Sequence, residues 1–280
     1  MSISKIDEHI FMIDVEVVGI RHFIASYVLM GEKTAIVETG PISSVQNLVR
    51  GLTSLGIKPD DVSYIAISHV HLDHGGGVGT LVKHFPKAKV IVHEKGAPHL
   101  ANPEKLWQRS QMVLGELAGK GIALQVVETL GHASHHLSYH ETRSKGAFVG
   151  DAAGIYLNDI DVIVPTTPPP FRLDMALTSL KKLADLKPSV LYYTHFGKAK
   201  DATGKLHMYA GQLRLWANIA KQLLDKGEDL EKISHQITEN DEAVKKALEY
   251  IQVHRVLSET VLKTSVLGVV EFVKNFGLPF

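Results

Sequence analysis

The run Ser68–Gly77 carries three histidines and one aspartate directly after an apolar, β-branched segment. His69 and His71 are two positions apart, and Asp73 and His74 follow them closely. Imidazole and carboxylate groups are ligands for first-row transition metals, and a loop at the end of a strand can point all four into one cavity. The glycines that close the run let the backbone turn tightly into the next helix. The run therefore predicts a metal site.

This run resembles the His-x-His-x-Asp-His signature of the metallo-β-lactamase superfamily. The resemblance implies three further ligand-bearing segments, in a set order, each at the end of a strand. Residues 129–136 are similar to the family's second histidine motif, Val149–Asp151 to its Gly-Asp motif and Tyr193–Gly197 to its last histidine motif. The order and approximate spacing match across residues 9–197, about two thirds of the chain.

The resemblance also implies a pair of divalent metal ions, most simply Zn²⁺, with Fe or Mn also compatible with such ligands. One ion would be bound by His69, His71 and His132, and the other by Asp73, His74 and His195, with Asp151 as a bridge. Asp73 and Asp151 would then be the catalytic carboxylates. Two dications, two aspartates and a bridging hydroxide sum to a charge of about +1, which favours an anionic transition state.

The implied activity is a dinuclear metallohydrolase in which the bridging hydroxide attacks an ester, thioester or lactone, as in the glyoxalase II-like branch. Thr194-His195-Phe196-Gly197 does not match that branch's Cys-Gly-His-Glu-x-Thr, so a glutathione thioester is not the expected substrate. Phosphodiesterase or phosphotriesterase activity is a first alternative, because the same metals suit phosphoryl transfer. A mononuclear iron persulfide dioxygenase is a second.

Three other functions are less favoured by the sequence. A flavodiiron oxidase would carry Glu in place of His71 and a flavodoxin-like domain after it. A scaffold without activity would have lost ligands, and all seven are present. Enzymes specific for β-lactams generally lack the bridging Asp151 and carry a signal peptide.

Several residues outside the ligand set could support the site. Glu38-Thr39-Gly40 stands where the family commonly has Asp-x-Gly, and it is expected to order the ligand loop by hydrogen bonding. His135 and His136 are candidates for a supporting role. Residues 165–172 form a proline-rich loop expected at the mouth of the cleft, and the Trp107 region and the helix Lys205–Lys226 are candidate lids. Further residues that could line the cleft are Tyr27, Tyr156, Phe171, Arg172, His207 and Tyr209.

The elements that must position these residues follow from hydrophobic periodicity. Strands are expected at His9–Val18, Phe23–Met30, Thr34–Glu38, Val62–Ile67, Lys89–His93, Leu124–Thr129, His136–His140, Ala147–Val149 and Val190–Tyr193. Helices are expected at Ser43–Leu55, Thr80–Phe85, Glu104–Lys120, Ala176–Leu186, Lys205–Lys226, Glu242–Gln252 and Arg255–Asn275. With the resemblance, this order predicts an α/β (α+β) fold: a four-layer αββα sandwich over residues 1–200, followed by a helical extension over 201–280 for substrate binding or dimerisation.

Composition sets the remaining limits. The 280 residues include no cysteine, so disulfides, thiolate zinc sites and iron–sulfur clusters are excluded. Lys+Arg and Asp+Glu are each 30, so net charge offers no case for nucleic acid or anionic membrane as a partner. The N-terminus has no secretory signal pattern, and no segment approaches 18 consecutive apolar residues. We therefore expect a cytoplasmic enzyme with a small-molecule substrate and no membrane partner, and a homodimer is compatible with the sequence.

Overall fold

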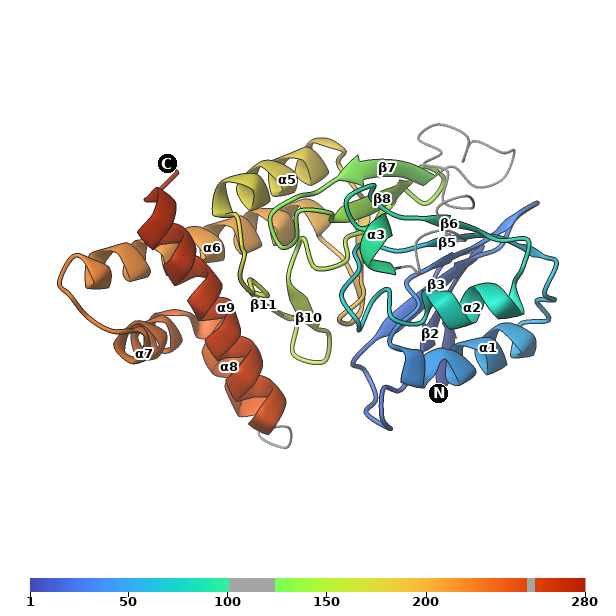
Figure 1. The fold of residues 1–280 in the computed structure, drawn as a ribbon, viewed down its shortest axis with the longest axis horizontal. Helices are drawn as coiled ribbons and strands as arrows, with labels where there is room; N and C mark the ends of the chain where they lie inside the picture. Colours follow the sequence, from blue (N-terminus) through green and yellow to red (C-terminus); the bar gives the residue numbers. More distant parts are fainter. Residues whose placement is uncertain (101–123, 251–254, 280) are drawn as a thin grey trace.

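Two β-sheets pack face to face in the computed structural model, which describes residues 1–100, 124–250 and 255–279 (Figure 1). The first sheet contains, in spatial order, β1 (Ser2–Lys5), β2 (Ile10–Asp14), β3 (Ala25–Leu29), β4 (Thr34–Val37), β5 (Val62–Ala66) and β6 (Lys89–Ile91). The second contains β13 (Gly197–Ala199), β12 (Val190–Tyr193), β9 (Gly146–Phe148), β8 (Leu137–Glu141) and β7 (Leu124–Glu128). A separate hairpin joins β10 (Ile155–Leu157) to β11 (Val162–Val164).

Parallel pairing brings the ligand-bearing strand ends together. β4, β5 and β6 pair in parallel in the first sheet, and β9 pairs in parallel with β12 in the second. The other neighbouring strands in the two sheets are antiparallel. The carboxyl ends of parallel neighbours lie at one edge of a sheet, and the loops that leave these ends are where side chains from distant parts of the chain can meet.

The space between the sheets is filled by large side chains from both. Tyr27 of the first sheet packs edge-on against Phe148 of the second, with ring centroids 5.1 Å apart, and Tyr192 stacks on Phe148. The hydroxyl of Tyr27 donates a hydrogen bond to the carbonyl of Tyr193. Tyr27 is therefore part of the core between the sheets, and the prediction that it lines the cleft is wrong.

Helices cover the outer face of each sheet, which confirms the four-layer αββα fold. α1 (Val45–Ser54) and α2 (Val78–His84) pack on the first sheet through a core that includes Leu48, Leu52 and Leu81. α5 (Leu173–Asp185) and α6 (Ala202–Leu224) cover the second through a core that includes Leu180 and Leu206. Short helical turns lie at Ile42–Ser44 (η1) and Ala97–Leu100 (α3).

Three more helices follow α6: α7 (Leu230–Asn240), α8 (Glu242–Tyr250) and α9 (Arg255–Phe276). They lie at the opposite end of the molecule from α1 and α2 (Figure 1). Trp216 of α6 is fully buried, and its indole NH donates to the Asp241 carboxylate at 2.7 Å, which ties α6 to the link between α7 and α8. No helix in the described ranges is both long and apolar enough to cross a membrane.

Most expected elements are confirmed, with differences of a few residues at their ends. The elements that were missed are β1, the short α3, the β10–β11 hairpin, β13 and α7, whose apolar residues Leu230, Ile233 and Ile237 have helical spacing. The missed strands have only three or four residues each, too few for a periodic pattern to be recognised. The helix expected at Glu104–Lys120 lies outside the described residues.

Candidate metal centre

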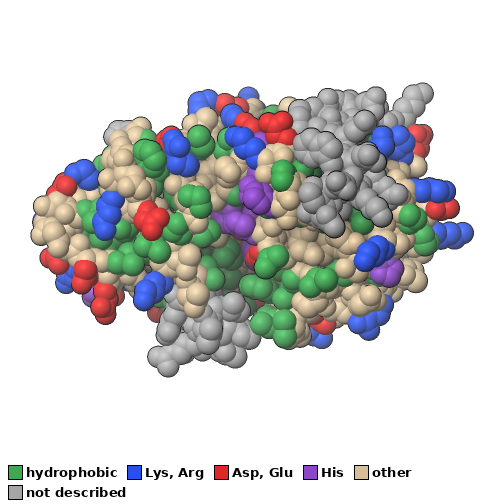
Figure 2. Space-filling model, viewed as in Figure 1, with side chains coloured by type: hydrophobic (Ala, Val, Ile, Leu, Met, Phe, Trp, Pro, Cys, Tyr) green, Lys and Arg blue, Asp and Glu red, His purple; other side chains and the backbone are tan. Residues whose placement is uncertain are grey.

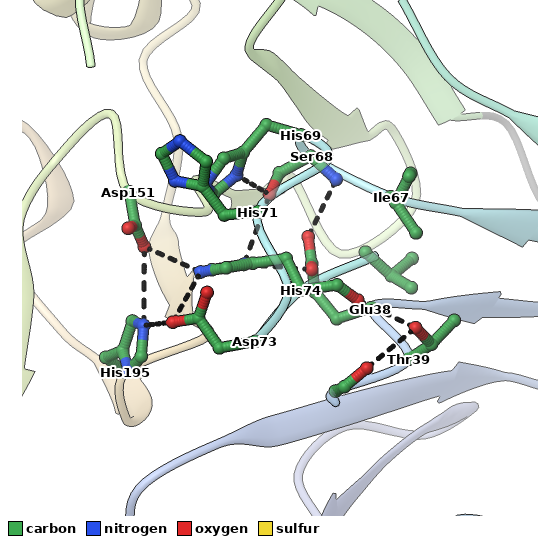
Figure 3. A network of polar contacts seen from close by, with 12 residues as sticks. Glu38, Thr39, Ile67, Ser68, His69, His71, Asp73, His74, Asp151 and His195 are labelled. Carbon is green, nitrogen blue, oxygen red and sulfur yellow. Dashed lines mark hydrogen bonds and ion pairs between the residues drawn. The ribbon is translucent and has the colours of Figure 1, made fainter. Parts of the chain in front are cut away.

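The seven side chains expected to bind metal converge at one edge of the sandwich, each carried by a loop that follows a strand. Figure 3 labels all of them except His132. The loop after β5 carries four of them, and the loops after β9 and β12 carry Asp151 and His195. His132 comes from the connection between β7 and β8. Gly150 allows the loop after β9 to approach closely. Its φ is +51°, and a Cβ there would stand 2.6 Å from Cβ of Ser68 and 2.7 Å from Nε2 of His136.

The first group is a trio of imidazoles. Nε2 of His69 lies 2.8 Å from Nδ1 of His71, which lies 3.1 Å from Nε2 of His132. The Nδ1–H of His132 donates to the Thr166 carbonyl at 2.9 Å, so its Nε2 carries the lone pair. Nδ1 of His69 is bonded to the Ser68 hydroxyl at 2.9 Å, which leaves Nε2 to face the trio. Three ring nitrogens thus face one another, as three histidine ligands of one metal ion would.

The second group contains Asp73, His74 and His195. Oδ2 of Asp73 lies 3.7 Å from Nε2 of His74 and 3.5 Å from Nε2 of His195. The other ring nitrogen of each histidine is occupied: the Nδ1–H of His74 donates to Oε2 of Glu38 at 3.0 Å, and that of His195 donates to the Phe23 carbonyl at 2.9 Å. Both Nε2 atoms therefore face the carboxylates. Against the effect of burial, Asp151 and Asp73 raise the pKa of both rings, so each would bind metal on loss of its Nε2 proton.

Asp151 lies between the two groups. Its Oδ2 is 3.4 Å from Nε2 of His132, and its Oδ1 is 3.3 Å from Nε2 of His74 and 3.7 Å from Nε2 of His195. Oδ1 of Asp151 and Nε2 of His74 are both buried without a hydrogen-bond partner. Polar atoms rarely stay buried unpaired, because desolvation has a cost, and a cation between them would satisfy both. The residues present therefore fit a pair of metal ions with nitrogen and oxygen ligands; that they bind metal stays a prediction.

The electrostatic surroundings keep the first trio in the form that binds metal. Burial lowers the pKa of His69 well below its ordinary value, helped by the charge of neighbouring His74. Burial likewise lowers the pKa of His71 to about 4 and, against the pull of Asp151, lowers that of His132. Burial alone would raise the pKa of Asp151, but His74, His132 and His195 outweigh it and hold that carboxyl ionised. Neutral imidazoles and an ionised carboxylate are the ligand forms.

Glu38 reaches the loop that it was expected to order. Its Oε1 accepts from the backbone NH of Ser68 at 2.8 Å, while Oε2 accepts from His74. The Thr39 hydroxyl donates to the carbonyl of His74 at 2.7 Å. The longer side chain of Glu, in place of the family's Asp, therefore still holds both ends of the ligand loop (Figure 3).

His136 and His135 differ in their contacts. Both nitrogens of His136 are occupied, Nδ1 by the Thr129 hydroxyl at 2.9 Å and Nε2 by the backbone NH of Asp151 at 3.0 Å. His136 thus supports the bridging residue and has no lone pair left for a metal. His135 is half-buried beside the first trio, with its ring centroid 6.3 Å from that of His69 and 6.2 Å from that of His71.

The other predicted cleft residues have mixed outcomes. The loop 165–172 reaches the site through the Thr166 carbonyl, and Tyr156 lines a cavity beside it. Tyr209 and Phe171 are buried in the core under the second sheet, His207 is exposed, and Arg172 pairs with Asp174 at 2.6 Å. α6 cannot be a lid because its apolar face is fully buried against the core. The Trp107 region lies outside the described residues.

A cavity of about 480 Å³ opens beside His195 and was not foreseen. Its walls come from the loop 20–23, the β10–β11 hairpin, His195-Phe196 and the helices α8 and α9. Figure 2 shows histidine side chains near the middle of this face and, directly below them, a hollow in which hydrophobic side chains gather. The backbone carbonyls that orient His132 and His195 were missed as well, because any residue type supplies a carbonyl.

Comparison with known proteins gives a consistent result. Residues 20–195 match the family model described as the metallo-beta-lactamase superfamily. Protein ST1585 of Sulfurisphaera tokodaii, a metallo-beta-lactamase fold-containing protein, is 30% identical over 231 residues, 72% of this chain and 79% of its own. The crystal structure of TTHA1429 from Thermus thermophilus superposes with a TM-score of 0.69 at 20% identity, covering 98% of this chain and 95% of that one. A shorter stretch of 48 residues, 17% of this chain and 16% of the relative, is 44% identical to N-acyl homoserine lactonase AiiB of Agrobacterium fabrum.

Proposed function

Because the chain belongs to the metallo-beta-lactamase superfamily, we propose that it is a dinuclear metallohydrolase that cleaves an ester, thioester or lactone. The superfamily's metal-dependent hydrolase fold is present, together with side-chain groups that could hold metal. The dinuclear centre, the reaction and the substrate are parts of the proposal.

One observation carries the proposal of two metals: the two carboxylate oxygens of Asp151 face different groups of ligands. Oδ2 faces His132 of the first group, and Oδ1 faces His74 of the second. A carboxylate in this position can contribute one oxygen to each of two ions, whereas a mononuclear site would leave one oxygen buried without a partner.

The ligand set also suits the charge of two cations. Asp73 and Asp151 together carry two negative charges, and the first trio of histidines is held neutral by burial. When bound, two dications would supply Lewis acidity toward a carbonyl oxygen and an ionised water at neutral pH, so no protein nucleophile is required. The chain's own part is to orient the ligands through Glu38, Ser68 and the Phe23 and Thr166 carbonyls, and to bind the substrate.

The cavity next to His195 favours a substrate whose attached group carries no charge. Among the described side chains that line the cavity next to His195, Arg21 is the one with a permanent charge, and it is 78% exposed and paired with Glu16. A charged group placed in this cavity would therefore have no fixed cation as its partner. The similarity of a short stretch to a lactonase supports an ester or lactone as the substrate.

Elemental analysis of protein purified without added metal, followed by ester, lactone and phosphodiester panels, tests the proposal. Two equivalents of metal, mainly zinc, with turnover of esters or lactones would support it. One equivalent of iron with oxygen uptake on persulfides would replace it with the dioxygenase. Turnover of phosphodiesters alone would replace it with the phosphodiesterase.

A further inference from the structure

The cavity beside His195 adjoins the candidate metal centre, because His195 belongs to both. The Nε2 edge of His195 faces Asp73 and Asp151, while the same residue also lines the cavity. Phe23, whose carbonyl orients that ring, lines the cavity too. A molecule whose reacting bond sits at the metal centre could therefore place an attached group in this cavity. Its volume of about 480 Å³ lies within the usual range of small-molecule sites.

Most side chains that line the cavity are apolar, and its one permanently charged side chain, Arg21, is 78% exposed and paired with Glu16. Leu157, Val164, Leu248 and Leu262 are among the aliphatic side chains that line it. The hydroxyl of Tyr156 donates to Asp161 at 2.7 Å, so it offers the cavity its ring rather than its hydroxyl proton. A polar or charged group placed there would give up hydrogen bonds to water without replacement, whereas an apolar chain would gain by burial.

Two of the walls belong to the helical C-terminal region. α8 contributes Val244, Ala247 and Leu248, and α9 contributes Val261 and Leu262. The opposite wall comes from the sandwich, through the loop 20–23 and the β10–β11 hairpin. α8 and α9 therefore complete a cavity that begins at His195, which gives these two helices a place in substrate selection.

We infer that this cavity binds an uncharged aliphatic chain of the substrate, so that the preferred substrates are esters or lactones bearing a medium-length alkyl or acyl chain. The inference rests on the proposed hydrolase function for the position of the reacting bond. The aliphatic chain could belong to the acyl half or to the alcohol half of the ester. In either case the group that contacts the cavity walls is an uncharged alkyl chain.

Two substrate series test the inference on the metal-loaded protein. One is the p-nitrophenyl esters from acetate to octanoate, and the other is the acetates of butanol, hexanol and octanol. We expect kcat/KM to rise about fourfold for each added methylene in one series until the cavity is full. The series that responds identifies the half that carries the chain. Hydrolysis at rates independent of chain length in both series would overturn the inference and leave the proposed hydrolase in place.

Direct binding provides a readout that does not depend on hydrolysis. Calorimetric titration with butanoate, hexanoate and octanoate should show a Kd that falls by a similar factor per methylene. If chain-length-dependent binding is found while no ester or lactone is hydrolysed, the proposed function fails and the apolar site stands. If neither binding nor hydrolysis depends on chain length, the inference is wrong.

Substitutions in the cavity wall test whether the chain-length preference arises in this cavity. Leu248→Trp and, on a different helix, Leu262→Trp each fill the cavity from a half-buried position. Each should lower the ratio of octanoyl to acetyl kcat/KM by at least about tenfold, as expected when a few methylenes lose their contacts. Leu215→Trp, on α6 and 36% exposed, is the matched control and should keep the wild-type ratio. Equal ratios in all four proteins would overturn the inference.

Discussion

The backbone NH of Asp151 donates a hydrogen bond of 3.0 Å to Nε2 of His136. Because Nε2 is the acceptor, the ring proton of this neutral imidazole is on Nδ1 and is donated to the Thr129 hydroxyl at 2.9 Å. The Thr129 hydroxyl can then donate to Ser138, whose own hydroxyl donates to the carbonyl of Val149. Burial lowers the pKa of His136 well below its ordinary value, which keeps this single tautomer. The chain of bonds fixes the loop that carries the bridging carboxylate.

His136→Leu should therefore weaken metal binding although His136 is not a ligand. Loss of a residue that orients a metal ligand typically costs about 10- to 100-fold in metal affinity. His136→Gln can restore an acceptor for the Asp151 NH and should retain more affinity than the leucine variant. His132→Ala removes a ligand and should cost more than either. Competition with a chromophoric chelator measures all three, and a larger loss in His136→Leu than in His132→Ala would mean that the two histidines have exchanged roles.

Glu38→Gln should weaken the second metal more than the first. Glu38 accepts from both the Nδ1–H of His74 and the backbone NH of Ser68, and the substitution removes its charge and one of its two acceptor oxygens. His74 belongs to the second group of ligands, so we expect a loss of about 10- to 100-fold in that step of a two-step metal titration. Glu94→Gln, at an exposed position, is the matched control and should titrate like wild type. Equal losses in both steps would contradict the role given to Glu38.

The sequence predicted which side chains converge at the candidate metal centre, but it did not predict the cavity beside them. Several histidines and an aspartate at this spacing rarely occur by chance, so the motif can be recognised in the sequence. The strands that precede these residues can also be recognised, because they are runs of apolar residues. The cavity beside His195 depends on α8 meeting the loop 20–23, and nothing local in either segment encodes that contact. Tyr27 is an error of another kind, because it was assigned to the cleft but lies in the core between the sheets. A tyrosine on a strand has the same local appearance whether its ring faces the other sheet or a cleft.

Asp161→Asn should destabilise the fold at neutral pH. Lys205 is 5% exposed, and its ammonium group lies 2.6 Å from Oδ1 of Asp161, so the variant leaves a nearly buried cation without its counter-charge. Removal of one partner of a buried pair costs several kcal/mol, but the Asp161 side chain is 70% exposed and water screens it, so we expect about 1–2 kcal/mol. Denaturant unfolding of both proteins at pH 7 measures the difference in free energy.

The same pair predicts the pH at which that difference vanishes. Hydrogen bonds from Lys205 and Tyr156 hold the pKa of Asp161 below its ordinary value of 3.8. A carboxyl whose pKa is depressed by folding stabilises the protein above the ordinary pKa, and this stabilisation is lost as the pH falls through the folded value. The difference between wild type and Asp161→Asn should therefore be constant above about pH 5 and shrink below pH 3.8. A difference that grows on acidification would contradict this account of the pair.

His69→Ala and Asp73→Ala should each cost metal and activity together while the fold survives. His69 is fully buried in the first trio, whereas the Asp73 side chain is 42% exposed in the second group. Asp73→Ala should therefore lose one metal equivalent with little change in stability, and His69→Ala should lose metal and also some stability, because it leaves a cavity. Elemental analysis and circular dichroism report metal and fold separately.

The double variant His69→Ala/Asp73→Ala is the decisive form of this test, because it removes one ligand from each group. A metal that binds the folded state raises the thermal midpoint by mass action. Wild type stripped with a chelator should therefore regain several degrees when zinc is added, whereas the double variant should show no response. The α-helical and β-sheet signals should persist, since the apolar cores on both faces of the sheets do not include the ligands. A double variant that holds two equivalents of metal and hydrolyses substrate at the wild-type rate would show that the metal centre lies elsewhere in the chain.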